Sequence, residues 1–250
     1  MKRISILAVS LALAALFAGC YTNVNWFGGQ TYRGDGNVTT EEYTIDGETH
    51  SLSLQVPTNV VGGAGLELRF VPGDKVTVRT DANLQSLFKP SESANRLSMG
   101  TLRDRYRFTT LEIEVGCDSG WESIELAGGM KCSNTQVLLA DCLELRVDGA
   151  IDGDLAVQAR ELRAWVNGAA DLDLVGEAEE LALSVNGAVQ IGAKGLETKK
   201  ADVTLNGAGN CELSVSDELT ARINGAGSVA YWGDPVVDKK IAGIGSITKK

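Results

Sequence analysis

The chain has 250 residues, a formal net charge of −10 at pH 7 and 44% hydrophobic residues. This apolar content, with only four prolines, predicts a globular protein of one or two domains and excludes a disordered chain. The acidic balance disfavours nucleic acid as a partner, and it equally disfavours a polybasic grip on anionic lipid.

The first twenty residues have the pattern of a secretory leader. A basic pair and an apolar run occupy residues 2–17, and Ala18-Gly19-Cys20 follows. The run is shorter than the roughly 20 apolar residues that a transmembrane helix needs. The segment resembles a bacterial lipobox, although Phe17 stands where leucine is usual. We expect a lipoprotein signal peptide over residues 1–19 and lipid attachment at Cys20. The alternative is an ordinary signal peptide with a chance cysteine.

Lipid attachment would place the protein in the bacterial cell envelope, anchored to a membrane through its N-terminus. Tyr21 follows the cysteine where aspartate would retain the protein in the inner membrane, which favours outer-membrane sorting in a Gram-negative host. Residues 20–40 are rich in glycine and polar side chains. We therefore expect a flexible tether over 20–40 and a folded domain over 41–250.

The first part of this domain, residues 41–122, has short runs of strand character without a fixed period. The runs are Ser51–Val56, Leu66–Phe70, Lys75–Thr80, Arg96–Leu102 and Leu111–Val115. Pro72-Gly73-Asp74 predicts a turn between the second run and the third. We expect these strands to begin or cap the architecture that residues 123–250 form.

From residue 123 onward one short phrase recurs. Its six copies are Val147-Asp148-Gly149-Ala150, Val166-Asn167-Gly168-Ala169, Val185-Asn186-Gly187-Ala188, Leu205-Asn206-Gly207-Ala208, Ile223-Asn224-Gly225-Ala226 and Ile241-Ala242-Gly243-Ile244. Their second residues are spaced by 19, 19, 20, 18 and 18, and residues 124–128 resemble a degenerate earlier copy. A fixed period of this length is typical of a solenoid, in which each repeat buries its apolar side only against its neighbours.

Apolar and polar residues alternate around each copy. One, three and five residues before the central position, seventeen of the eighteen side chains are apolar, and Lys239 in the last copy is the exception. A period of two predicts half-buried strands rather than helices. A second strand follows each glycine, as Cys211 and Leu213 indicate. The sequence therefore predicts an all-β chain folded as a right-handed parallel β-helix with about 19 residues per coil.

The Asn-Gly pairs have a structural and a functional interpretation. They are Asn167 with Gly168, Asn186 with Gly187, Asn206 with Gly207 and Asn224 with Gly225. As structure, each pair makes a sharp corner, because asparagine tolerates and glycine permits the left-handed conformation. The stacked amides would also hydrogen-bond to one another. As function, a row of amides could bind glycan hydroxyl groups. The structural interpretation is favoured.

Besides Cys20 the chain has four cysteines, an even number that an exported protein can pair. We expect one disulfide among Cys117, Cys132 and Cys142, with its pairing open, and a buried thiol at Cys211. No C-x-x-C pair is present and His50 is the only histidine, so the sequence predicts no metal site and no cofactor.

Several segments together carry a family resemblance. They are the strand pair of residues 66–80, Asp81-Ala82-Asn83-Leu84, Arg96-Leu97-Ser98-Met99, the Asn-Gly-Ala-Gly corners at 206–209 and 224–227, and the ending Tyr231-Trp232-Gly233-Asp234-Pro235 with the glycine-rich residues 242–247. Over roughly residues 41–250 the chain resembles the head GIN domain of putative auto-transporter adhesins. The resemblance implies an exported β-solenoid, frequently an envelope lipoprotein, without established catalytic residues.

Four carboxylates support the enzymatic alternative: Asp152, Asp154, Asp171 and Asp173. An Asp-x-Asp pair points both side chains to one face of a strand, and the repeat would stack the two pairs. Two carboxylates can act as acid and base in polysaccharide cleavage, and four can hold calcium. However, the next repeat has Gln190 and Gly192 at these positions, and no basic partner is evident. A solvated acidic face is therefore the favoured interpretation.

Tryptophans mark candidate binding surfaces. Trp165 is expected to point outward on a central repeat, whereas Trp26, Trp121 and Trp232 lie in or near predicted loops. Exposed tryptophan can stack on sugar rings or on partner surfaces, although for Trp232 we favour packing over the open end of the last coil. An uncovered end also allows self-association into a homo-oligomer.

These observations predict a non-enzymatic, lipid-anchored envelope protein whose β-helix presents a surface for binding or adhesion to a glycan or protein ligand. A carbohydrate-active β-helix enzyme, a polysaccharide lyase or hydrolase that uses the acidic face, is the first alternative. A purely structural envelope protein is the second.

Overall fold

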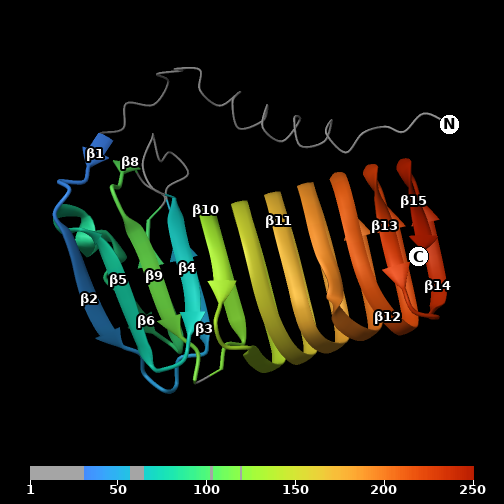
Figure 1. Cartoon of the computed structure of the whole chain (residues 1–250), viewed down its shortest axis with the longest axis horizontal. Coiled ribbons are helices and arrows are strands. Elements are labelled where there is room, and N and C mark those ends of the chain that lie inside the picture. The colour runs from blue at the N-terminus through green and yellow to red at the C-terminus, as the bar shows by residue number, and fades with distance from the viewer. Residues whose placement is uncertain (1–30, 57–64, 102–103, 119) are drawn as a thin grey trace. The chain divides into compact units, whose positions relative to one another are not determined.

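The computed structural model describes residues 31–56, 65–101, 104–118 and 120–250, which belong to one compact unit, Thr31–Lys250. This part is all-β, as predicted, apart from one 3₁₀ helix (Figure 1). The elements are β1 (Thr31–Arg33), β2 (Val38–Thr44), β3 (Ser51–Gln55), β4 (Leu66–Val71), β5 (Lys75–Asp81), η1 (Ala82–Phe88), β6 (Ser91–Ser93), β7 (Arg96–Gly100), β8 (Arg105–Arg107), β9 (Leu111–Gly116), β10 (Ser123–Asn134), β11 (Leu138–Leu205), β12 (Ala208–Ile223), β13 (Ala226–Trp232), β14 (Val236–Ile241) and β15 (Ile244–Lys249). Most of them join one long sheet whose path runs from β2 to β15.

Copies of the repeated phrase lie in register with one another. β12 pairs in parallel with β11 at Ala188 and Ala208, and β13 pairs in parallel with β12 at Ala208 and Ala226. β15 continues the series by pairing Ile244 with Ala226. Figure 1 shows the result as a row of similarly directed strands from β10 to β15. The 18- to 20-residue spacing is therefore the chain length that returns the backbone to the same place in the next row.

The alternating pattern decides which side chains form the core. In the first five repeats every position predicted to point inward is buried, as Leu162, Ala164 and Val166 illustrate with exposures of 1% or less. Full burial of an aliphatic side chain contributes about 1.5–3 kcal/mol. In the last repeat Lys239 and Ile241 are exposed at the equivalent positions.

The strands before residue 123 continue the same sheet, but not in chain order. β10 pairs in parallel with β11 on one side, where Ala127 faces Asp148, and with β3 and β4 on the other. β3 in turn pairs with β7, and β4 with β9. The segment of residues 51–71 therefore lies in space between residues 96–116 and residues 123–134. The predicted strands and the turn at Pro72-Gly73-Asp74 are present, whereas this order was not predicted.

The sheet ends in antiparallel strands at β5 and β2. β5 pairs with β9, and β2 then pairs with β5. The helix η1, which follows β5, buries Leu84 and Phe88, and the Phe88 ring lies 5.7 Å from that of Phe108. Aromatic side chains thus fill this end of the core, where the short repeat is absent.

The expected tether over residues 20–40 is wrong in its second half. Residues 31–33 and 38–44 form β1 and β2, so the folded unit begins at Thr31 rather than at residue 41. Asp81, which is fully buried, holds this segment: its carboxylate accepts hydrogen bonds from the Gly36 amide at 2.9 Å and from the Thr109 amide at 2.8 Å and hydroxyl at 2.5 Å. Burial alone would raise the pKa of Asp81, but these hydrogen bonds outweigh it and hold the pKa below its ordinary value. Residues 20–30 lie outside the described residues.

Candidate functional site

The asparagines of the repeated phrase form one hydrogen-bonded column on the outside of the stack. Asn167 donates to Asp148 at 2.8 Å, Asn186 to Asn167 at 3.0 Å, Asn206 to Asn186 at 3.0 Å and Asn224 to Asn206 at 2.8 Å. All five side chains are exposed. Each interior amide uses one donor and one acceptor within the column, which leaves it one N–H group for a ligand or for water.

At three of the four Asn-Gly corners, glycine is required for a different reason from the one predicted. Gly168 has the predicted positive φ, at 137°, but Gly187, Gly207 and Gly225 do not, and no corner asparagine has a left-handed backbone. Instead, a Cβ on Gly187 would lie 1.8 Å from the carbonyl oxygen of Gly168, and one on Gly207 would lie 1.9 Å from that of Gly187. The corner expectation is corrected accordingly: stacked backbones approach so closely here that no side chain fits between them. Gly225 repeats the contact, with a Cβ at 1.9 Å from the carbonyl of Gly207.

The four predicted aspartates are all exposed, on the strand that follows the corner. Asp152 lies beside Lys131, at 3.8 Å between Nζ and Oδ2, and Asp173 extends over Gly192 of the next repeat. Burial raises the pKa of Asp171, and the negative charges of Asp173, Asp152 and Asp154 raise it further. The structure therefore brings the four carboxylates into electrostatic contact.

This cluster does not have the arrangement of a metal site. Within the described ranges, no group of three or more histidine, cysteine, aspartate or glutamate side chains is placed to hold a metal ion. Its chemistry is that of an acidic, solvated surface on which one carboxyl group, Asp171, binds its proton more tightly than usual.

One tryptophan differs from the expectation, and two others contact cations. Trp121 is buried, and its indole N–H donates to the Gly116 carbonyl at 3.1 Å, so it belongs to the core. Trp232 stacks under the Lys194 ammonium at 4.5 Å, and Trp165 under the Arg146 guanidinium at 4.8 Å. Both half-buried rings therefore already have a cation on one face. Trp26 lies outside the described residues.

The expected disulfide among Cys117, Cys132 and Cys142 is absent, and all three are free thiols. Cys132 faces the core, whereas Cys142 lies on the outer side of the first repeat and is only partly covered, so the two point away from each other. Cys211 is a buried thiol, as predicted. Burial raises the pKa of Cys132 and of Cys211 to about 12, which keeps both protonated.

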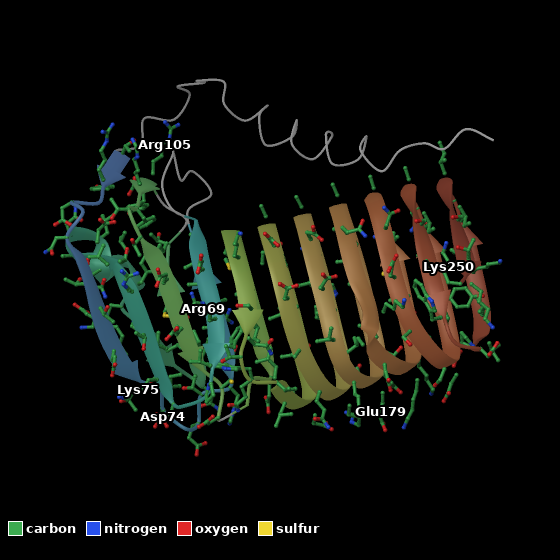
Figure 2. The ribbon with its side chains drawn as sticks, in the orientation of Figure 1. Arg69, Asp74, Lys75, Arg105, Glu179 and Lys250 are labelled. Carbon is green, nitrogen blue, oxygen red and sulfur yellow. The ribbon has the colours of Figure 1, made fainter. Side chains whose placement is uncertain are left out.

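A second outward column was not predicted. It lies at the bend on the opposite side of each repeat from the corners. Its members follow one another at intervals of 19 or 20 residues and have alternating charges: Asp141, Arg160, Glu179 and Lys199. Arg160 donates to both carboxylate oxygens of Asp141 at 2.8 and 3.0 Å, and Lys199 donates to Glu179 at 2.7 Å. Figure 2 shows Glu179 at this bend, pointing away from the sheet. This alternation of charge at the spacing of the repeat is present in the sequence and would have predicted the column.

The candidate lipid attachment site, Cys20, lies outside the described residues. Among the helices of the described part, none has both the length and the apolar composition that a membrane span requires.

Solved structures of other proteins share this fold. A putative adhesin from Bacteroides fragilis superimposes with a TM-score of 0.76 at 18% identity, over 87% of this chain and 99% of that one. A putative adhesin from Parabacteroides distasonis gives a TM-score of 0.65 at 17% identity, over 88% and 100%. A putative lipid binding protein from the same species gives 0.64 at 19%, over 88% and 100%. At these identities the likeness concerns the fold alone.

Among curated proteins, none matches the sequence. The family model described as putative auto-transporter adhesin, head GIN domain, matches residues 58–235, which is most of the chain. The chain therefore belongs to the family of putative auto-transporter adhesin head GIN domains.

Proposed function

We propose that this protein is a non-enzymatic, lipid-anchored component of the bacterial cell envelope that presents a β-solenoid surface for binding or adhesion. The observation that carries the proposal is the long, in-register stack of repeats, whose outward side chains form continuous columns, in a chain of the adhesin family. Columns of this kind offer many identical contacts to an extended partner, which is how stacked-repeat proteins use their surfaces.

The architecture that we infer from the register is a right-handed parallel β-helix. Successive repeats pair in parallel and return to equivalent positions after 18–20 residues, as one coil after another would. The right hand follows from the general preference of parallel crossover connections. The lipid anchor at Cys20 is inferred from the leader sequence.

An acidic-face enzyme is the second candidate, because one observation favours it. A polysaccharide hydrolase uses two neighbouring carboxyl groups, one of which has a raised pKa, and the pKa of Asp171 is raised by burial and by the charges of Asp173, Asp152 and Asp154. The exposure of these side chains on an open surface speaks against it, since water competes with a sugar there. A purely structural envelope role is the remaining alternative.

Adhesion and catalysis differ in turnover. Bacteria that carry the full chain on their surface are expected to be retained on immobilised host or bacterial cell-wall material, without release of reducing ends or unsaturated uronates. Glycan release that disappears in Asp171→Asn or Asp173→Asn would establish the enzyme instead. Loss of both retention and turnover would leave the structural role.

The anchor is tested separately. Cys20→Ser should move the protein from the membrane fraction to the soluble fraction, with Cys142→Ser as the control that leaves it in place. Unchanged membrane retention of Cys20→Ser would refute lipidation.

A further inference from the structure

A groove runs along the bend that carries the alternating charges. Two depressions, of about 440 and 810 Å³, are lined by residues of successive repeats and share Glu177 and Glu179. They meet at these two residues and are here together called the bend groove, which extends from Leu139 in the first repeat to Ser216 in the fifth and reaches Gly233 in the sixth. The groove crosses the strands and follows the stacking direction.

The burial pattern of the bend explains the shape of the groove. In the second, third and fourth repeats a small residue is buried between two outward neighbours, and these small residues are Ala159, Ala178 and Thr198. The Thr198 hydroxyl donates to the Ser214 carbonyl at 2.6 Å and so stays within the floor. Because no large side chain occupies the floor, the outward neighbours stand as walls on both sides.

The walls carry unbalanced negative charge. The two basic residues that line the groove are already neutralised, Arg160 by Asp141 and Lys199 by Glu179. Glu177 and Glu197, which lie one repeat apart on the opposite wall, make no ion pair and no hydrogen bond within the described part of the chain. Two carboxylates with all their acceptor capacity thus face a shallow, solvent-filled groove.

We propose that the bend groove binds an extended, basic polypeptide segment, which would make it the ligand site of the binding function proposed above. An extended peptide rises about 3.3 Å per residue, so basic side chains on alternate residues recur about every 6.6 Å and can reach carboxylates on neighbouring repeats, which are about 4.8 Å apart. About six residues span the groove.

The composition of the groove selects against other polymers. Anionic chains such as uronates, teichoic acids or nucleic acids would meet the charges of Glu177 and Glu197. A neutral glycan would lack a stacking platform, because no aromatic side chain is among the described residues that line the groove. Leu139, which is 55% exposed at one end, instead offers an apolar contact of the kind that peptide side chains use.

The test uses the full chain and a fluorescein-labelled, amidated hexapeptide, Lys-Ser-Lys-Ser-Lys-Ser, with fluorescence anisotropy at low and at physiological salt. The variant is Glu177→Gln with Glu197→Gln. The matched control, Asp152→Asn with Asp154→Asn, removes the same charge from another face. Two exposed ion pairs predict a roughly two- to thirtyfold rise in Kd for the groove variant and little change for the control.

An equal loss in both double variants would show general attraction to an acidic protein, and it would overturn the groove as the site. Absence of hexapeptide binding would overturn it too, and displacement of the peptide by chitohexaose would reassign the groove to a glycan. Cell adhesion that persists undiminished in the groove variant would overturn the groove while leaving the proposed function intact. The chain could also bind the hexapeptide, lose that binding in the groove variant, and yet show no adhesion to any surface. This result would support the groove as a peptide site and refute the adhesive function.

Discussion

Gly187 is the position at which one added methyl group tests the stacking of the repeats most directly. A Cβ there would lie 1.8 Å from the Gly168 carbonyl oxygen, where ordinary contact begins at 3.4 Å. The φ of Gly187 lies outside the left-handed region, so Gly187→Ala carries no torsional penalty. Apart from the loss of unfolded-chain entropy that every Gly→Ala change brings, the substitution therefore tests the approach of two backbones.

The magnitude follows from this distance. Relief of the contact requires the two repeats to part by roughly 1.6 Å, about a third of the 4.8 Å between neighbouring strands. Overpacking of this kind costs about 1–3 kcal/mol, and each ladder hydrogen bond that is stretched out of range costs about 0.5–1.5 kcal/mol more. We expect Gly187→Ala to lower the free energy of unfolding by about 3–5 kcal/mol and Tm by roughly 10 °C.

Urea unfolding followed by far-ultraviolet circular dichroism measures the change, and two other glycines supply controls. An added Cβ on Gly129 or on Gly36 meets no atom within 4 Å, but Gly36 has a φ of 77°. Gly129→Ala should be neutral or stabilise by up to about 1 kcal/mol, and Gly36→Ala should cost only the torsional penalty of about 1–2 kcal/mol. If Gly187→Ala unfolds within about 0.5 kcal/mol of Gly129→Ala, close backbone stacking is not what selects glycine at the corners.

Three further predictions concern the asparagine column, the buried carboxylate of Asp81 and the cysteine thiols. Asn186→Ala removes two amide–amide hydrogen bonds from the exposed column and should lower the free energy of unfolding by about 1–2 kcal/mol in urea; an unchanged midpoint would show that the column adds no stability. Because the pKa of Asp81 is lowered in the folded chain, its contribution is present at neutral pH and is lost as pH falls from about 3.9, the unfolded value, through the lower folded pKa. Asp81→Asn should therefore reduce stability at pH 7 and flatten the acid dependence below about pH 5, and an equally steep fall in the variant would contradict this assignment. Iodoacetamide at pH 8 should modify Cys142 long before Cys132 and Cys211, whose buried thiols have pKa values raised to about 12, and peptide mass spectrometry showing equal rates would refute the burial assignment.

The regular repeats of the fold could be predicted closely because each of them has the same local pattern of residues. Inward residues alternate with outward ones, so a period of two within a period of 19 identifies Leu162, Ala164 and Val166 as core before any coordinates are known. The amide column follows from the same periodicity, since equal spacing places each asparagine beside the next. In these repeats the neighbour in space is also the next repeat in sequence.

Predictions were incomplete or wrong where neighbours in space are not consecutive repeats in the sequence. The disulfide expected among Cys117, Cys132 and Cys142 is absent, and Cys132 faces the core whereas Cys142 is only partly covered on the outer side. Trp121 lies in the loop between β9 and β10, as predicted, but its burial and the hydrogen bond from its N–H to the Gly116 carbonyl were not predicted. The tether was extended too far because the contacts that order residues 31–44, to Asp81 and β5, come from much later in the chain.

The sequence by itself determined the all-β character, the length of the repeat and the inward residues of residues 143–223. Local alternation and fixed spacing are properties of a single strand and its neighbour, and both are written in consecutive residues. Only the tertiary structure decided that residues 51–71 lie between residues 96–116 and 123–134, that backbone contact rather than left-handed torsion selects glycine at most corners, and that Glu177 and Glu197 line one depression. Each of these depends on distances between segments far apart along the chain, which the pattern of neighbouring residues does not encode.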